Sequence, residues 1–135
     1  MIKINVSKQT NYPISTVNLK NFLQKFFLEK GIVSDAEVFV SFVNEAKMKD
    51  IGKKYYRRSL ASSAGKNDLR IHNVFSFVDS ESMKFPGDKI NLGEIVVCFP
   101  IVVKEANTEG KLIEEKVLEL IEHSALHLLG IHHEE

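Results

Sequence analysis

Apolar residues recur around nearly the whole circumference of a helix from Lys111 to Leu129, and no other feature constrains the fold of the chain as strongly. These residues are Leu112, Ile113, Val117, Leu118, Leu120, Ile121, Ala125 and Leu128. A surface helix has apolar residues on one face only, whereas a helix that is apolar on most sides is buried among other elements. We therefore expect the rest of the domain to cover this helix.

The remaining chain mixes strand and helix patterns without the strict alternation of a βαβ fold. Alternating or β-branched segments predict strands at residues 2–6, 36–43, 74–77 and 94–99. Apolar residues at helical spacing predict helices at residues 15–30, 45–57 and 100–106, in addition to 111–129. We predict a single α/β (α+β) domain over residues 1–135, in which helices pack on a four-stranded mixed sheet.

Residues with special backbone preferences mark the ends of several elements. Ser15 or Thr16 suits the N-cap of the first helix, and Gly31 suits the position just after its C-terminus. Pro100 is compatible with the first turn of the third helix. Residues 58–73 are polar and predict a loop of about sixteen residues, a length that is usually functional or mobile in compact domains.

The composition suits one soluble intracellular domain. Eighteen basic side chains balance eighteen acidic ones, so the chain as a whole has no net attraction to nucleic acid or to an anionic membrane. Cys98 is the single cysteine, and its apolar surroundings predict a buried, inert thiol. The N-terminus lacks the apolar region of a secretory signal, and no apolar stretch approaches the roughly 18 residues of a membrane span. We expect a cytoplasmic protein without a membrane partner.

Histidines concentrate near the C-terminus, where four of the five lie within the last thirteen residues. His123 and His127 are four residues apart, so in a helix their side chains share one face about 5 to 6 Å apart. Gly130 follows, and glycine accepts the left-handed conformation that ends a helix. The reversed chain can return His133 to the same point, which predicts three imidazole nitrogens around one metal ion.

Three protein ligands leave the fourth position of a tetrahedral ion to water, which is the arrangement of a catalytic zinc site. Zinc lowers the pKa of such a water from about 15.7 toward about 7. Two histidines four residues apart on a helix are, taken alone, more often ordinary surface or core residues than ligands. The third histidine after a helix-ending glycine reverses that preference. His132 is interpreted as the solvent-facing neighbour of His133, with which it can exchange roles.

One part of a zinc peptidase is absent. In the His-Glu-x-x-His pattern a glutamate follows the first histidine and acts as general base, whereas Ser124 stands at that position here. Glu122 precedes His123, and a rotation of about 100° per residue carries it off the metal-facing side. The sequence therefore disfavours a peptidase.

The C-terminal segment resembles the signature of the YbeY-type endoribonucleases, also called rRNA maturation factors, which reads His-Gly-x-Leu-His-Leu-x-Gly-Tyr-Asp-His. Residues 123–133 read His-Ser-Ala-Leu-His-Leu-Leu-Gly-Ile-His-His. The three histidines match in identity and spacing. Ser124, Ile131 and His132 replace the Gly, Tyr and Asp of the family.

Two upstream segments are similar to the same family. Residues 73–77, Asn-Val-Phe-Ser-Phe, resemble its Asn/Asp-Val-Leu-Ser-Phe strand, and residues 92–98 resemble its Leu-Gly-Asp-Ile-Val-Ile-Cys segment. The resemblance implies a zinc-bearing domain with a zincin-like metal helix near the C-terminus. It also implies cleavage of single-stranded RNA, action in 16S rRNA maturation and ribosome quality control, and a small-subunit partner. We expect no DNA partner.

The arginine thought to help catalysis in the family ends the motif Leu-Asn-x-x-Tyr-Arg. An ungapped alignment of residues 51–56 places Tyr56 at that arginine position. A shift of one residue places Arg57 there, so Arg57 is the candidate catalytic residue, with Arg58 as the alternative. Ser76 lies on the strand expected beside the metal, and the sequence assigns it no role.

Basic and acidic residues are concentrated in different segments of the chain, even though the net charge is zero. Between Lys47 and Arg70 eight basic residues stand against two acidic ones, and between Glu105 and Glu135 eight glutamates stand against two lysines. Two tyrosines lie inside the basic segment, and single-stranded nucleic acids bind to basic grooves with aromatic side chains. The alternative is a solvated helix face with the tyrosines packed inward. The metal site in the same domain makes RNA contact the preferred interpretation.

Three classes of function remain. We expect a metal-dependent endoribonuclease, although no general base is identifiable. The second class is a non-catalytic ribosome-associated factor in which the ion holds the C-terminal turn in place. Another zinc hydrolase, such as a peptidase, is the third.

Overall fold

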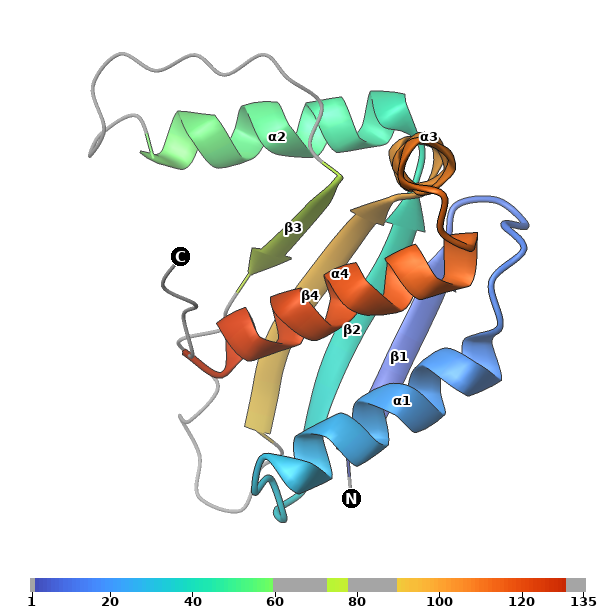
Figure 1. The fold of residues 1–135 in the computed structure, drawn as a ribbon. Helices are drawn as coiled ribbons and strands as arrows, with labels where there is room; N and C mark the ends of the chain where they lie inside the picture. The colour runs from blue at the N-terminus through green and yellow to red at the C-terminus, as the bar shows by residue number, and fades with distance from the viewer. Residues whose placement is uncertain (1, 60–72, 78–89, 131–135) are drawn as a thin grey trace.

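The computed structural model describes residues 2–59, 73–77 and 90–130 (Figure 1). They form a four-stranded sheet with helices on both faces, which confirms the predicted single-domain α/β fold with a mixed sheet. No helix in these three segments is both long enough and apolar enough to cross a membrane.

The sheet has three parallel strands and one antiparallel edge strand. Its strands are β1 (Ile2–Lys8), β2 (Ala36–Val43), β3 (Val74–Phe77) and β4 (Ile90–Cys98). They lie in the order β1-β2-β4-β3, with β1, β2 and β4 parallel and β3 antiparallel to β4. The short strand β3 therefore forms one edge of the sheet.

The described helices are α1 (Thr16–Glu29), α2 (Glu45–Ser59), α3 (Phe99–Glu109) and α4 (Ile113–Leu128). Ser15 caps α1, because its side-chain oxygen accepts a hydrogen bond of 3.1 Å from the amide of Asn18. Gly31 follows α1 with a φ of 91°, and Gly110 turns the chain after α3 with a φ of 69°. The caps predicted for the first helix are thus present.

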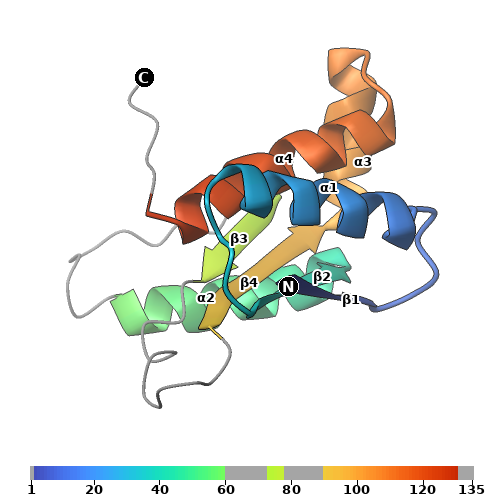
Figure 2. The same ribbon diagram turned by 90° about the horizontal axis from the view of Figure 1, so that it is seen from below.

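Helices cover the two faces of the sheet unequally. Figures 1 and 2 show α1 and α4 on one face and α2 on the other. The larger core lies beneath α1 and α4 and contains the fully buried side chains of Phe27, Phe42 and Ile121. A smaller core beneath α2 includes Met48 and Phe75. The face that carries α4 therefore contains most of the buried apolar surface.

The predicted elements are present, and their boundaries differ by a few residues. The strands predicted at 36–43 and 74–77 coincide with β2 and β3. The helix predicted at 45–57 extends to Ser59, so it takes up the first residues of the expected loop, and residues 60–72 of that loop lie outside the described part of the chain. β4 begins at Ile90, before the predicted residue 94, and Phe99 belongs to α3.

α4 is buried on one broad side only, so the expectation that it is covered on most sides holds in part. Val117, Ile121 and Ala125 are almost completely buried, whereas Glu119 is exposed on the opposite side. Leu112, counted in the apolar pattern, precedes the helix and is 71% exposed. The helix therefore has a solvent-facing side on which polar side chains are available.

Ion pairs fix the start of α4 against the end of α3. Nζ of Lys116, whose side chain is 9% exposed, lies 2.9 Å from Oε2 of Glu109 and 3.8 Å from Oε1 of Glu119. Lys111 pairs with the same two carboxylates at 3.4 and 2.5 Å. Hydrogen bonds from Lys116 and Lys111 lower the pKa of Glu109 and of Glu119, respectively, below the ordinary carboxyl value. The cluster joins the two helices on either side of the turn at Gly110.

Gly93 of β4 allows the C-terminal end of α4 and the edge strand β3 to approach β4 closely. Its φ of 130° falls in the region that favours glycine. A β-carbon at this position would lie 2.2 Å from the carbonyl oxygen of Phe77 and 2.9 Å from the side chain of Leu128. The pairing of β2 with β4 also shifts register here, between Glu37 and Val38.

We expect Gly93→Ala to lower the free energy of unfolding by about 3 to 5 kcal/mol, because the methyl group meets the Phe77 carbonyl and the backbone keeps an unfavourable φ. Urea unfolding followed by circular dichroism measures the loss. Gly31→Ala is the matched control, because Gly31 also has a positive φ but a β-carbon there meets no atom within 4 Å. The control should lose about 1 to 2 kcal/mol. Equal losses in the two variants would contradict the close approach at Gly93.

Candidate metal centre

α4 carries two histidines on its exposed side near its C-terminal end. His123 and His127 are exposed, whereas Ser124, Ala125 and Leu128 beside them are buried. A spacing of four residues places both imidazoles on one face of the helix, as predicted. Because the buried side is packed on the sheet, the two histidine positions belong to a fixed element.

A neighbouring strand holds the ring of His127. Nδ1 of His127 lies 3.0 Å from Oγ of Ser76 in β3. In a hydrogen bond between a hydroxyl group and an imidazole nitrogen either group can be the donor, and the tautomer of the ring decides which one donates. Where the hydroxyl group accepts from Nδ1–H, Nε2 is unprotonated and is the ring nitrogen that suits a metal ion.

The register of the sheet explains why Ser76 faces α4. Ser76 pairs with Ile95 of β4, and Val74 pairs with Val97. Ile95 and Val97 belong to the core beneath α1 and α4. Successive residues of a strand point to opposite faces, so Phe75 packs in the smaller core on the side of α2. The hydroxyl group of Ser76 is therefore directed to the histidine helix by strand geometry.

Gly130 ends the helical region as the sequence predicts. Its φ is 77°, and its amide donates a hydrogen bond of 3.0 Å to the carbonyl oxygen of His127. His133, the predicted third ligand, and its neighbour His132 lie outside the described residues. The convergence of three imidazoles therefore stays a prediction.

The two described histidines fit a zinc site. Imidazole nitrogens are zinc ligands, and a ligating histidine ordinarily engages its second ring nitrogen in a hydrogen bond, as His127 does with Ser76. Within residues 2–59, 73–77 and 90–130, no group of three His, Cys, Asp or Glu side chains is arranged to hold an ion. His133, the third ligand that the sequence predicts, lies outside these segments.

The position of a peptidase base is occupied by a buried serine. Ser124 follows His123 and is only 3% exposed. Glu122 is exposed and precedes the first histidine. No carboxylate of α4 therefore stands where the general base of a His-Glu-x-x-His peptidase would be.

The first part of the basic segment, from Lys47 to Ser59, lies in α2, and residues 60–70 lie outside the described part of the chain. Lys47, Lys49, Lys53 and Lys54 are exposed, and Lys54 pairs with Asp50, one turn earlier, at 3.3 Å. Exposed pairs of this kind are weak and are screened by salt, so these cations remain accessible to an anionic ligand.

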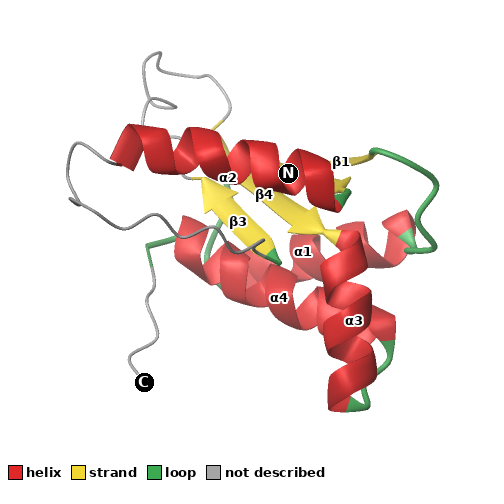
Figure 3. Ribbon diagram, turned by 90° about the horizontal axis from the view of Figure 1, so that it is seen from above, coloured by secondary structure: helices red, strands yellow, loops and turns green. Residues whose placement is uncertain are grey.

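The candidate arginines lie at the end of the same helix. Arg57 and Arg58 fall within the last residues of α2, and their side chains are outside the described part of the structure. Figures 1 and 3 show the C-terminal ends of α2 and α4 on the same side of the molecule, with the edge strand β3 between the two helices. The backbone therefore brings the arginine positions and the histidines toward the same edge of the sheet.

Two residues that shape this region have roles that sequence patterns alone do not give. The contact of Ser76 with His127 depends on strand register. The close approach at Gly93 depends on a backbone conformation. An isolated glycine beside a strand pattern is a general signal of a bulge or of close backbone approach, and it is the pattern that hints at the role of Gly93, which also matches the glycine of the similar family segment.

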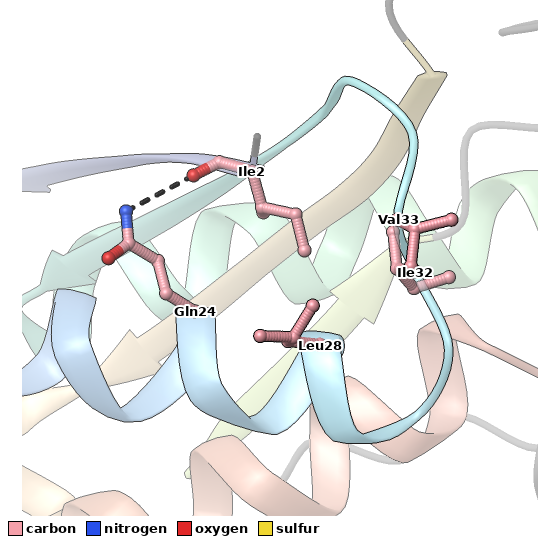
Figure 4. Close-up of a pocket in the computed structure, with 5 residues that line it drawn as sticks. All are labelled: Ile2, Gln24, Leu28, Ile32 and Val33. Atoms are coloured by element: carbon pink, nitrogen blue, oxygen red, sulfur yellow. Dashed lines mark hydrogen bonds between the residues drawn. The ribbon is translucent and has the colours of Figure 1, made fainter.

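A separate pocket lies near the opposite edge of the sheet, between β1 and α1 (Figure 4). Its cavity of about 280 Å³ is lined by Ile2, Gln24, Leu28, Ile32 and Val33. The side-chain amide of Gln24 donates a hydrogen bond of 3.2 Å to the carbonyl oxygen of Ile2. None of the lining side chains ionises, so the pocket offers no acid, base or metal ligand for catalysis.

Comparisons with known proteins connect the chain to one family. The family model described as Endoribonuclease YbeY matches residues 4–135. The Endoribonuclease YbeY of Aromatoleum aromaticum is 35% identical over 100 residues, which cover 74% of this chain and 54% of the relative. That of Pseudomonas entomophila is 31% identical over 103 residues, which cover 74% and 57%. The chain thus spans little more than half the length of these two relatives.

A solved structure shares the fold. The solution structure of a protein from Thermotoga maritima is similar with a TM-score of 0.61 and 24% identity, over 97% of this chain and 75% of that chain. This likeness supports the arrangement of sheet and helices described above.

We expect His127→Ala to abolish zinc binding, because it leaves only two of the three predicted ligands. Elemental analysis of the purified variant, after equilibration with zinc and dialysis, measures the metal content. Glu122→Gln is the matched control, since Glu122 is exposed on the same helix, and it should keep the zinc content of the unaltered protein. An unchanged zinc content in His127→Ala would end the hypothesis.

Proposed function

Because this chain belongs to the endoribonuclease YbeY family, we propose that it is a zinc-dependent endoribonuclease that cuts single-stranded RNA. The observation that carries the proposal is the pair of exposed histidines on α4, of which His127 is engaged through Nδ1 by Ser76. The signature in residues 123–133 adds His133 as the third ligand.

The three histidines would hold the ion. His123 and His127 lie on a helix packed against the sheet, and His133 follows the turn at Gly130. Three nitrogen ligands suit zinc best, and another divalent ion with affinity for imidazole is the alternative. When bound in such a site, the ion acts as a Lewis acid toward a phosphoryl oxygen.

The C-terminal part of α2 would bind the RNA. Its exposed lysines attract phosphates, and the attraction weakens as salt is added. We assign to Arg57, or alternatively Arg58, the stabilisation of the negative charge that develops on the phosphate in the transition state. A guanidinium group suits this role because it stays protonated and binds phosphate oxygens in a bidentate manner. The adjacent Tyr55 and Tyr56 provide rings for base stacking.

The proposed cellular substrate is ribosomal RNA. The family resemblance supports action on 16S rRNA during maturation and quality control of the small ribosomal subunit, in the cytoplasm. The exposed lysines of α2 fit a ribosomal partner, because assembled ribosomal RNA presents phosphates at its surface.

A non-catalytic ribosome-associated factor is the second candidate. It is favoured by Tyr56, which takes the ungapped position of the arginine that the family resemblance assigns to catalysis. In that case the ion would stabilise the turn after α4 without acting on RNA. The buried Ser124 disfavours the remaining candidate, a zinc peptidase.

We expect the zinc-loaded protein to cut single-stranded RNA and to leave casein intact. A chelator should abolish the cleavage, and added zinc should restore it. Gel electrophoresis of labelled RNA and of casein, with and without chelator, distinguishes the three candidates. Zinc binding without RNA cleavage would support the non-catalytic factor, and chelator-sensitive loss of casein would support the peptidase.

The same assay assigns the arginine. Changing the responsible residue, Arg57 or Arg58, to Ala should lower kcat about 10²- to 10³-fold and leave the zinc content unchanged. Lys20→Ala is the charge-matched control, because Lys20 is exposed on α1, which carries none of the residues of the proposed site. Full activity in both arginine variants would remove the arginines from the mechanism.

A further inference from the structure

We propose that Ser76 is a positioning residue that holds the ring of His127 in the Nδ1–H tautomer, with Nε2 directed to the metal ion. The inference rests on the proposed metal site and adds a function for a residue of the edge strand β3. Its basis is the 3.0 Å contact between Ser76 Oγ and His127 Nδ1.

The direction of the hydrogen bond follows from what a metal ligand requires. A histidine that binds zinc through Nε2 keeps its proton on Nδ1, and that N–H group needs an acceptor. Ser76 Oγ is an oxygen acceptor at hydrogen-bonding distance from this nitrogen. The serine therefore both selects the tautomer and fixes the rotation of the imidazole ring.

The serine is itself held in place by the sheet. Its pairing with Ile95 fixes its position along β4, and its side chain lies on the face covered by α4. The next residue, Phe77, has its carbonyl oxygen against Gly93, where a β-carbon would not fit. The Ser76 hydroxyl group therefore belongs to a short strand whose position and rotation are fixed by its pairing with β4 and by the contact at Gly93.

The contact is suited to positioning more than to holding the fold together. The structure places this hydrogen bond at an exposed site, where water competes for both groups. Its removal should change stability little, because the core beneath α4 does not include Ser76. The orientation of the His127 ring should change more, because the hydrogen bond to Ser76 engages Nδ1 directly.

The test measures zinc affinity by competition with a chromophoric chelator. Ser76→Ala should weaken zinc binding by about 10- to 100-fold, the usual cost of removing the hydrogen-bond partner of a ligating histidine. Ser76→Thr keeps the hydroxyl group and suits a strand, so it should restore the affinity. Ser41→Ala is the matched control, because Ser41 also forms side-chain hydrogen bonds on the sheet, with Ser7 and Glu94, and should bind zinc as the unaltered protein does.

A second readout needs no metal. Correlation spectra of the ring nitrogens and protons in ¹⁵N-labelled, metal-free protein report which nitrogen of a neutral imidazole carries the hydrogen. His127 should be in the Nδ1–H tautomer in the unaltered protein and should lose this preference in Ser76→Ala. An Nε2–H tautomer in the unaltered protein would overturn the proposal whether or not the variant folds.

The outcomes separate this proposal from the proposed function. Zinc binding that is equal in the unaltered protein and in folded Ser76→Ala overturns the role of Ser76 and leaves the metal site intact. Absence of zinc binding by the unaltered protein overturns both. Weakened binding in Ser76→Ala that Ser76→Thr does not restore also contradicts the proposal, because the hydroxyl group would then not be the cause.

Discussion

The packing of α4 against the sheet is the constraint on which the candidate metal centre depends. Val117, Ile121 and Ala125 bury one side of the helix. Because a helix rotates by about 100° per residue, this burial leaves His123 and His127 together on the opposite, exposed side. Ion pairs at the start of the helix and the glycine beneath its end hold it at both ends. The positions of the two proposed ligands are therefore consequences of the core.

The edge strand β3 links the two parts of the proposed site. One of its faces directs Ser76 to the histidine helix, and the other packs Phe75 in the core beneath the basic helix α2. Four residues with alternating side-chain directions thus join the helix proposed to bind a metal ion to the helix proposed to bind phosphate. In a small domain this arrangement places both proposed functions at one edge of the sheet.

Sequence periodicity predicted the strands and helices well because their buried faces repeat at regular intervals. Boundaries were less predictable where polar residues enter a regular element, as at Ile90 to Gly93, which pairs as a strand despite its loop-like composition. The histidine pair was predictable because both residues belong to one helix. The contact between Ser76 and His127 was not predictable, because 51 residues separate them and it takes both the sheet register and the packing of α4 on the sheet to bring them together.

The central claim is that one ion binds three imidazoles, two from α4 and one from the chain after Gly130. The X-ray absorption spectrum of the zinc-loaded protein tests it most directly, because it reports the number and kind of atoms around the ion. We predict three imidazole nitrogens at about 2.0 to 2.1 Å and one oxygen at a similar distance. A shell of oxygens alone, or one with fewer than three imidazoles, would contradict the account.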